Sequence, residues 1–258
     1  MSNKRVKLSN KPLVEAIFEI RWQLTKTDFG FVDPHYKVLV GRMYDKLVKD
    51  YPFHEALPSS NFPDGMLDYV VQHRFRKGNG EWPLIQIGPG ILTVNDTENY
   101  VWEDFEKKVL EAIDILIELY PDAKKNININ KILLQYIDAI EFDFEKTDIL
   151  KFLKEKLKIN INLYDDLFLS NDINNFPSDL DLRFSYNTNK PKGVINIRFR
   201  RGKKLDIKAL IWETVMSSNL LDSKNIRKSI GVWIQDSHRL IDDWFFKLID
   251  GELLERFK

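Results

Sequence analysis

The chain has 258 residues, of which 43% are hydrophobic and 30% charged, and its 39 basic residues balance its 39 acidic ones. This is an ordinary globular composition, and a net charge near zero argues against a globally basic nucleic-acid binder or a polycationic membrane binder. Cysteine is absent, which excludes disulfides, thiolate zinc sites and cysteine nucleophiles. No stretch approaches the ~20 apolar residues of a membrane span, and the N-terminal segment lacks an apolar run long enough for export. We therefore expect a cytoplasmic protein with no membrane partner.

The first half of the chain predicts a strand, a helix, three strands and a second helix. Residues 12–24 alternate apolar and polar side chains, which is typical of a strand in an antiparallel sheet. Asp33 and Pro34 indicate a helix start with Asp33 as N-cap, and residues 51–65 hold three prolines and predict a long loop. Strands are expected at 66–77, 82–88 and 91–95, and the apolar spacing over 101–120 predicts a helix.

The second half repeats this order. A strand is expected at 131–144, followed by a helix at 147–158 whose N-cap is Thr147 or Asp148. After an Asn- and Asp-rich stretch at 159–178, strands are expected at 180–187, 193–200 and 205–217, and a long helix at 222–249.

A short sequence repeat supports two related halves. Arg74–Gly78 (RFRKG) recurs 124 positions later as Arg198–Gly202 (RFRRG), and the same shift lays Val14–Ile20 onto Asp138–Phe144. We predict a single domain made of two halves, about 10–122 and 130–250. The predicted fold class is α+β, with two β-α-β-β-β-α halves forming a large antiparallel sheet and helices packed on one face. This element order resembles the TATA-binding-protein-like and helix-grip class, in which a curved sheet has a concave side.

Several segments together resemble a sporadically distributed family of bacterial proteins that has no established activity. Two of them are Asn10–Trp22 (NKPLVEAIFEIRW) and Gln86–Asn95 (QIGPGILTVN). Single residues extend the resemblance along nearly the whole chain, namely Tyr100, Trp102, Glu103, Phe105, Tyr136, Ile137, Asp138, His238 and Phe245. The resemblance assigns no residue roles. The patchy distribution implies mobile islands, where phage-defence genes accumulate.

The two basic segments contain the candidate functional residues, which are Arg74, Arg76, Lys77, Arg198, Arg200, Arg201, Lys203 and Lys204. Strand alternation places the arginines on one face, and guanidinium groups suit phosphate oxygens. A pair of basic hairpins is therefore a candidate nucleic-acid interface. The alternative is a solvated sheet face, in which the arginines pair with Glu19, Glu141 or Asp143.

No catalytic set, metal site or cofactor site emerges from the other motifs. Gly88-Pro89-Gly90 joins two apolar strands and lacks the Gly-Lys-Ser/Thr of a phosphate loop, so it predicts a hairpin turn. The four histidines are dispersed, and we expect an interfacial or capping role for His238, with Asp242 within reach one helical turn later. Alternating acids at 141–145 and 179–181 resemble Mg²⁺ ligands, but the accompanying Glu106-x-Lys108 lies on a predicted helix, which argues against a nuclease.

Three functional hypotheses stay open. The first is a non-enzymatic binding or assembly protein with a protein partner or a second copy of itself, within a mobile-island or phage-defence system. The second is nucleic-acid binding through the paired basic hairpins. The third is a helix-grip-like ligand receptor or enzyme with a cavity between the sheet and the long helix, lined by Trp22, Trp212 or Trp233 with a convergent polar group.

Overall fold

The computed structural model describes residues 8–28, 30–97, 99–169, 177–219 and 225–258. The strands are β1 (Leu13–Trp22), β2 (Thr25–Thr27), β3 (Gly30–Val32), β4 (Phe53–Ala56), β5 (His73–Arg76), β6 (Leu84–Gly88), β7 (Ile91–Asp96), β8 (Ile129–Glu141), β9 (Asp181–Asn189), β10 (Lys192–Lys204) and β11 (Ile207–Ser218). The helices are α1 (Tyr36–Leu47), η1 (Pro58–Asn61), α2 (Trp102–Leu119), α3 (Ala123–Asn126), α4 (Ile149–Lys156), η2 (Asp165–Phe168), α5 (Ile226–Ile249) and α6 (Glu252–Phe257).

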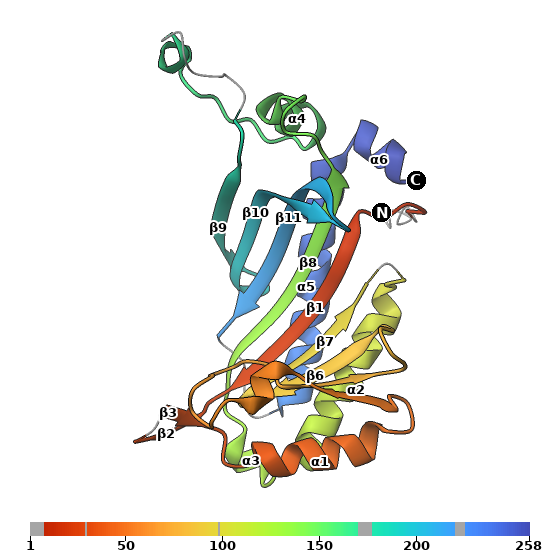
Figure 1. Ribbon diagram of the computed structural model, residues 1–258, viewed down its shortest axis with the longest axis vertical. Coiled ribbons are helices and arrows are strands. Elements are labelled where there is room, and N and C mark those ends of the chain that lie inside the picture. The colour runs from red at the N-terminus through yellow and green to blue at the C-terminus, as the bar shows by residue number, and fades with distance from the viewer. Residues whose placement is uncertain (1–7, 29, 98, 170–176, 220–224) are drawn as a thin grey trace.

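Nine strands form one antiparallel sheet in the order β4-β5-β6-β7-β1-β8-β11-β10-β9, which confirms the predicted α+β class (Figure 1). The first strands of the two halves, β1 and β8, pair at its centre, with Phe18 opposite Leu134. From this pair β7, β6 and β5 extend one way, and β11, β10 and β9 extend the other. The sheet order is therefore approximately two-fold, while common ancestry of the halves stays a prediction.

The sequence repeat does not follow this approximate symmetry. Arg74 lies on β5, the third strand out from β1, whereas Arg198 lies on β10, the second strand out from β8. Phe18 lies inside β1, whereas Phe142 follows the end of β8. The shift of 124 residues therefore aligns β5 with β10, which is not its equivalent in the fold, and carries the middle of β1 past the end of β8.

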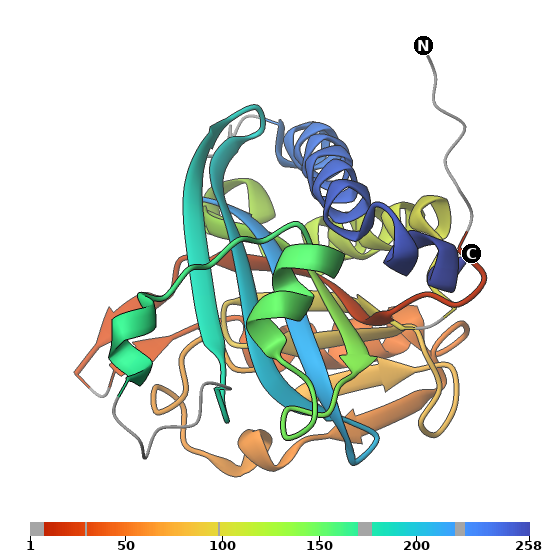
Figure 2. The same ribbon diagram turned by 90° about the horizontal axis from the view of Figure 1, so that it is seen from above.

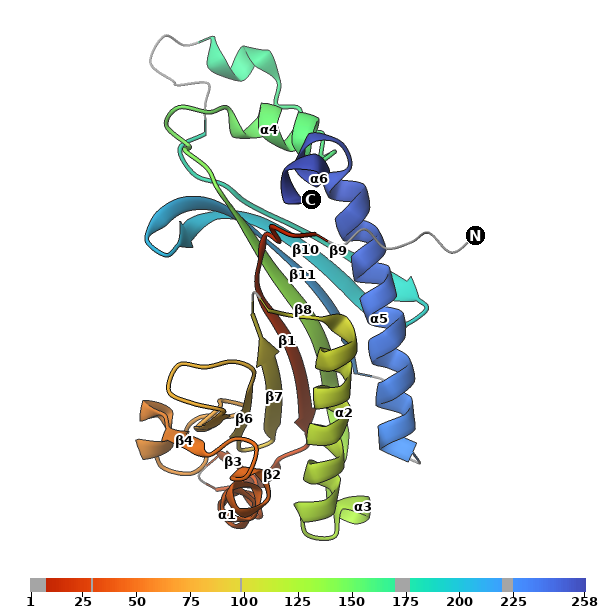
Figure 3. The same ribbon diagram turned by 90° about the vertical axis from the view of Figure 1, so that its right-hand side faces the viewer.

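The helices cover one face of the sheet, here called the helix face, which carries Phe18, Leu134 and Trp212. Figure 3 shows α2 and α5 side by side against this face, with α5 running along much of its length. The alternating residues of β1 and the apolar stripe of α2 meet in a core that includes Phe18, Ile20, Phe105 and Ile113, all fully buried. Burial of large apolar side chains such as these is the main stabilising contribution to folding.

A second core fills the far end of the helix face. There α4 and α6 pack on the end of the sheet, and the buried residues include Phe142, Leu153, Phe199 and Trp212. The segment around Asn10 meets α6 at this end of the molecule, where the Asn10 N–H donates to the Phe257 carbonyl at 3.0 Å (Figures 1 and 2). The segment before β1 is thus held against α6.

The opposite face, here called the open face, is partly covered by the segment 57–72. Gly88 marks the contact, because a Cβ atom on Gly88 would lie 1.9 Å from the Val70 carbonyl oxygen. The predicted loop at 51–65 contains β4 and η1. The strand expected at 66–77 shortens to β5, because residues 66–72 belong largely to this covering segment.

The start of α1 differs from the prediction. The helix begins at Tyr36 with His35 at the cap position, and Asp33 is not its N-cap. The Asp33 carboxylate still accepts the His35 backbone N–H at 3.0 Å, as a capping side chain does, and it also accepts hydrogen bonds from the Trp22 indole at 2.9 Å and the Tyr120 hydroxyl at 2.8 Å. At α4 the expected cap is present, since the Asp148 side chain accepts from the backbone N–H of Leu150.

The C-terminal end of the chain holds α6, a helix that the sequence analysis does not predict. The first residues expected for the long helix, 222–224, lie outside the described residues. Within the described ranges, no helix combines the length and apolar character that crossing a membrane requires.

Candidate functional site

A cavity of about 450 Å³ lies between the helix face of the sheet and α5. Its walls come from the segment before β1, the start of α2, the strands β8 and β11, and the middle of α5. The lining residues are Leu8, Lys11, Pro12, Leu13, Tyr100, Val101, Trp102, Glu103, Tyr136, Asp138, Thr214, His238, Ile241, Asp242, Phe245 and Phe246.

Regular backbone geometry brings these side chains together. Tyr136 and Asp138 are two residues apart on β8, so both point to the helix face. His238, Ile241, Asp242 and Phe245 follow the helical spacing that places them on one side of α5. Strand residues thus line one side of the cavity, and residues of α5 line the opposite side.

A hydrogen-bonded chain crosses the cavity wall. The hydroxyl oxygens of Tyr100 and Tyr136 lie 2.7 Å apart, and the Tyr136 hydroxyl lies 3.0 Å from His238 Nδ1. Burial raises the pKa of Tyr100 well above its usual value, and the neighbouring Tyr136, Asp242 and Glu103 raise it further. This chain links the start of α2 to β8 and then to α5.

Asp138 is the most unusual group in the cavity. Its side chain is buried, with 4% of the residue exposed. Among the residues that the structure describes, none donates a hydrogen bond to its carboxyl group. Burial raises the pKa of Asp138 to about 8, against a small lowering by Lys204. A buried carboxyl group without a donor is costly unless it is protonated or meets a partner.

The cavity lies where the third hypothesis placed it, but its lining differs from the expectation. Trp22 and Trp212 are fully buried in the two cores, and Trp233 packs in the first core. Trp102 is the tryptophan that lines the cavity, with its ring stacked on His238 at a centroid distance of 3.8 Å. His238 thus lies in the cavity wall, where α5 contacts Tyr136 of β8 and Trp102 of α2, so of the two expected roles the interfacial one fits and the capping one is wrong.

The main cavity residues belong to no sequence motif that identifies a functional site. They are Tyr100, Trp102, Tyr136 and Asp138. The signal that was present is the family resemblance, because most of its single residues converge on the cavity. The segment Asn10–Trp22 also contributes Lys11, Pro12 and Leu13. The Gln86–Asn95 segment, in contrast, forms the β6–β7 hairpin through the expected turn at Gly88–Gly90.

The basic residues near β5 are engaged in ion pairs on the open face. Arg74 Nη1 and Arg76 Nε lie 3.4 Å and 3.6 Å from the Glu55 carboxylate on β4. Arg74 also donates to Gln86 at 2.8 Å, and Arg76 lies over the Trp82 ring. Lys77 directly follows β5.

The second basic set lies on β10, near the other edge of the sheet. Arg198 makes a two-pronged contact with Asp181 at 2.8 and 2.6 Å, and Arg200 contacts Glu213 at 2.9 Å. Lys203 lies 3.8 Å from Asp206, and Lys204 ends β10.

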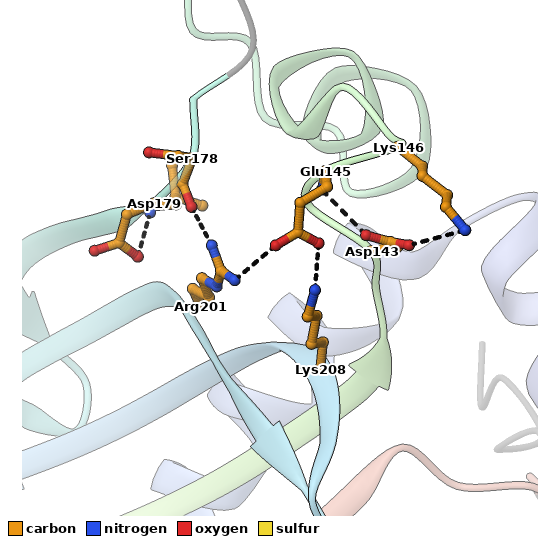
Figure 4. Close-up of polar contacts among 8 residues, drawn as sticks. Asp143, Glu145, Lys146, Ser178, Asp179, Arg201 and Lys208 are labelled. Atoms are coloured by element: carbon orange, nitrogen blue, oxygen red, sulfur yellow. Dashed lines mark hydrogen bonds and ion pairs between the residues drawn. The ribbon is translucent and has the colours of Figure 1, made fainter.

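Glu145 joins the remaining members of this second set. Its carboxylate lies between Arg201 and Lys208, while Arg201 also donates to the Ser178 carbonyl (Figure 4). Lys208 and then Asp143 lead the contacts that hold the pKa of Glu145 down to about 2. The neighbouring Asp143 contacts Lys146.

The structure does not bring the two basic sets together. Five strands, β6, β7, β1, β8 and β11, separate β5 from β10. The carboxylates that neutralise the arginines are Glu55, Asp181, Glu213 and Glu145. The expected partners Glu19, Glu141 and Asp143 are wrong, because partners come from adjacent strands and loops, and Glu19 pairs with Arg21. Nucleic-acid binding stays a prediction.

The histidines are less dispersed than the sequence indicates. His54 Nε2 and His73 Nδ1 lie 3.0 Å apart across the β4–β5 pair. Burial, followed by the effect of His54, lowers the pKa of His73. Over the described ranges, no three His, Asp or Glu side chains form a group that could hold a metal ion.

Comparison with known proteins gives no family. No family profile matches the chain, and no curated protein matches it. Among solved structures, a di-domain ARO/CYC protein, BexL, aligns over 92% of this chain and 99% of its own, with 10% identity and a TM-score of 0.19. At this TM-score the likeness carries no argument about fold or function.

Proposed function

We propose that this protein binds a small, largely apolar molecule in the cavity between the sheet and α5. The observation that carries the proposal is the combination of a cavity of about 450 Å³ with a buried carboxyl group that has no donor among the described residues. Protein interiors leave few voids larger than a water molecule. Ligand sites of roughly 300–1,000 Å³ are mostly apolar with a few convergent polar groups, and this lining has that character.

A cavity-filling variant with a matched control tests the proposal. Thr214 and Val215 are adjacent on β11, so their side chains point to opposite faces, and only Thr214 lines the cavity. Native mass spectrometry of the purified protein and ligand-observed NMR with a fragment library would detect bound molecules. We expect binding by wild type and Val215→Phe, and loss of binding in Thr214→Phe. Binding that survives in a folded Thr214→Phe protein would overturn the proposal.

Turnover of the bound molecule is a second candidate, and the Tyr100–Tyr136–His238 chain favours it. Chains of hydroxyl and imidazole groups can move a proton to or from a bound substrate. The native mass spectra would reveal turnover as a mass change in the bound molecule with time. A bound molecule that stays chemically unchanged supports a receptor instead.

The proposal has two further parts. The fold is of the helix-grip type, and the chain is a member of the bacterial family that it resembles. The curved sheet with a long C-terminal helix supports the first, and the convergence of the resembled residues on the cavity supports the second. A mobile-island or phage-defence setting stays a prediction, which a plaque assay with and without the gene would measure.

A protein partner or self-association, the first hypothesis from the sequence, likewise stays a prediction. The specific feature that bears on it is the segment 163–169 around η2, where Tyr164, Leu167 and Leu169 are 71%, 59% and 72% exposed. Exposed apolar groups gathered in one segment are typical of contact surfaces. Light scattering of wild type and Tyr164→Ser/Leu167→Ser would measure whether the segment mediates association.

A further inference from the structure

Asp138 sits where a ligand would meet it. Its backbone pairs with Leu13 of β1 and with Trp212 of β11, so the side chain is fixed in the middle of the sheet and cannot swing out to solvent. The carboxyl group lines the cavity, is at least nine-tenths buried, and receives no hydrogen bond from the described residues. The missing donor is therefore one that a ligand would supply.

The other charges around the cavity are mainly negative. Glu103 at the start of α2 and Asp242 on α5 add two carboxylates to that of Asp138. Lys11 is the one lysine of the lining, and its ammonium donates to the Tyr100 carbonyl at 2.6 Å. Asp242 and Glu103 also contribute to the raised pKa of Tyr100, which reports a negative potential at that wall. This environment favours a cation over an anion.

Aromatic rings supply much of the remaining wall. Trp102, Tyr100, Tyr136 and Phe245 all line the cavity. Aromatic faces attract organic ammonium groups, and desolvation strengthens the attraction. One buried carboxylate surrounded by rings suits an organic cation better than a metal ion, which requires several oxygen ligands.

We infer that the ligand is an organic amine, with its ammonium group against the Asp138 carboxylate and its apolar body among the aromatic rings. This inference rests on the proposed function and adds the ligand's chemical class. The alternative within the same cavity is a neutral ligand whose carbonyl or hydroxyl accepts a hydrogen bond from a protonated Asp138.

Three probes of nearly equal shape separate these cases. Tryptamine is a cation at neutral pH, tryptophol is its neutral alcohol analogue, and indole-3-acetate is an anion. Their affinities would be measured by calorimetry for wild type, Asp138→Asn and Asp104→Asn. Asp104 lies on α2 next to Glu103, is exposed, and does not line the cavity, so its variant removes one negative charge without touching the site.

For wild type and Asp104→Asn we expect tryptamine to bind at least tenfold tighter than tryptophol, and indole-3-acetate to bind weakest. Asp138→Asn should lower tryptamine affinity to the tryptophol level and leave tryptophol affinity unchanged. Circular dichroism would show that the variant is folded, and Asp138→Ser serves as a second variant if it is not.

Equal binding of the three probes, or tighter binding of the alcohol or the acid, would overturn the amine inference while leaving ligand binding intact. If none of the three probes binds, the fragments that bind in the library screen test the inference by their charge. If most of those fragments are not cations, the inference is overturned. No binding by any probe or fragment overturns the proposed function as well.

Discussion

The indole ring of Trp102 lies flat against the imidazole ring of His238, with centroids 3.8 Å apart and planes 7° apart. This contact ties the first residue of α2 to the middle of α5. Both residues also border a second, smaller cavity of about 300 Å³, which Glu103, Glu106, Gln235 and Arg239 complete. The stacked pair therefore forms part of the wall between two neighbouring cavities.

Replacing Trp102 with alanine should join the two cavities and destabilise the fold. We expect a loss of about 2–4 kcal/mol in the free energy of unfolding, because a large ring is removed and the stack on His238 is lost. Trp82→Ala is the control, because Trp82 is 36% exposed beside Arg76 and should cost less than about 1 kcal/mol. Urea unfolding measures both, and equal losses would contradict the role given to Trp102.

The central hydroxyl of the hydrogen-bonded chain should matter more than the terminal one. Tyr136→Phe removes the contacts to both Tyr100 and His238, so we expect a cost of about 1–3 kcal/mol, since buried partners lose their hydrogen bond. Tyr100→Phe leaves the contact between Tyr136 and His238 and should cost about 0.5–1.5 kcal/mol. Thermal and urea unfolding compare the two variants. The reverse ranking would show that the chain is not organised around Tyr136.

Asp138 should make the protein less stable as the pH rises. Its pKa is raised by burial in the folded chain to about 8 from an ordinary value of 3.8. Between these values the folded state holds a proton that the unfolded state has lost, so the free energy of unfolding falls with pH. The stability advantage of Asp138→Asn over wild type should therefore grow by on the order of 2–4 kcal/mol between pH 5 and pH 8.5.

Urea unfolding of wild type and Asp138→Asn at the two pH values measures this difference directly. The other charged and polar groups around the cavity, such as His238, Asp242 and Lys11, are the same in both proteins, so their effects largely cancel in the comparison. Asp104→Asn, which changes an exposed acid, should follow the wild-type pH dependence. A difference between wild type and Asp138→Asn that does not change with pH would show that the carboxyl group keeps its ordinary pKa.

Local patterns predicted most of the fold. The alternation in β1, the apolar stripe of α2 and the Asp148 cap are properties of short segments, and each has the expected structure. Asp33 accepts the His35 backbone N–H as a local pattern predicts, but its contacts with Trp22 and Tyr120, which are distant in sequence, are not local. The repeated arginine segments predict equivalent hairpins for a related reason, because local similarity does not show that the two strands occupy different places in the sheet order.

The site was harder to predict than the fold, because its residues come from five separate parts of the chain. Asp138 looks like one acid among several in an acidic stretch, and only the sheet order shows that it lies between β1 and β11 on the helix face. The position of a cavity between sheet and helix followed from the element order. The identity of its tryptophan did not, because Trp22 and Trp212 pack fully into the cores.

Because the arginines of the open face form ion pairs, replacing one of them with an acidic residue should lower the free energy of unfolding. Arg200→Glu would place a second carboxylate against the largely buried Glu213, which should cost about 1–3 kcal/mol. Lys203→Glu, on the same strand but 66% exposed, should stay within about 0.5 kcal/mol of wild type. In a folded Arg76→Glu/Arg200→Glu variant, a lower nucleic-acid affinity with a flatter salt dependence would instead support the basic-hairpin hypothesis.

Two glycines allow the packing of segment 57–72 on the open face to be tested. Gly88→Ala would drive a methyl group to 1.9 Å from the Val70 carbonyl oxygen, so the segment or the β6–β7 hairpin must move. We expect a loss of at least about 1–3 kcal/mol in the free energy of unfolding, as for other overpacking changes.

Gly41→Ala is the control, since it adds the same methyl group to α1 with no atom within 4 Å. Because alanine favours helix, this variant should gain about 0.5–1 kcal/mol. If Gly88→Ala were as stable as wild type, and hydrogen exchange of residues 57–72 were unchanged, the segment would not be held against the sheet at Gly88.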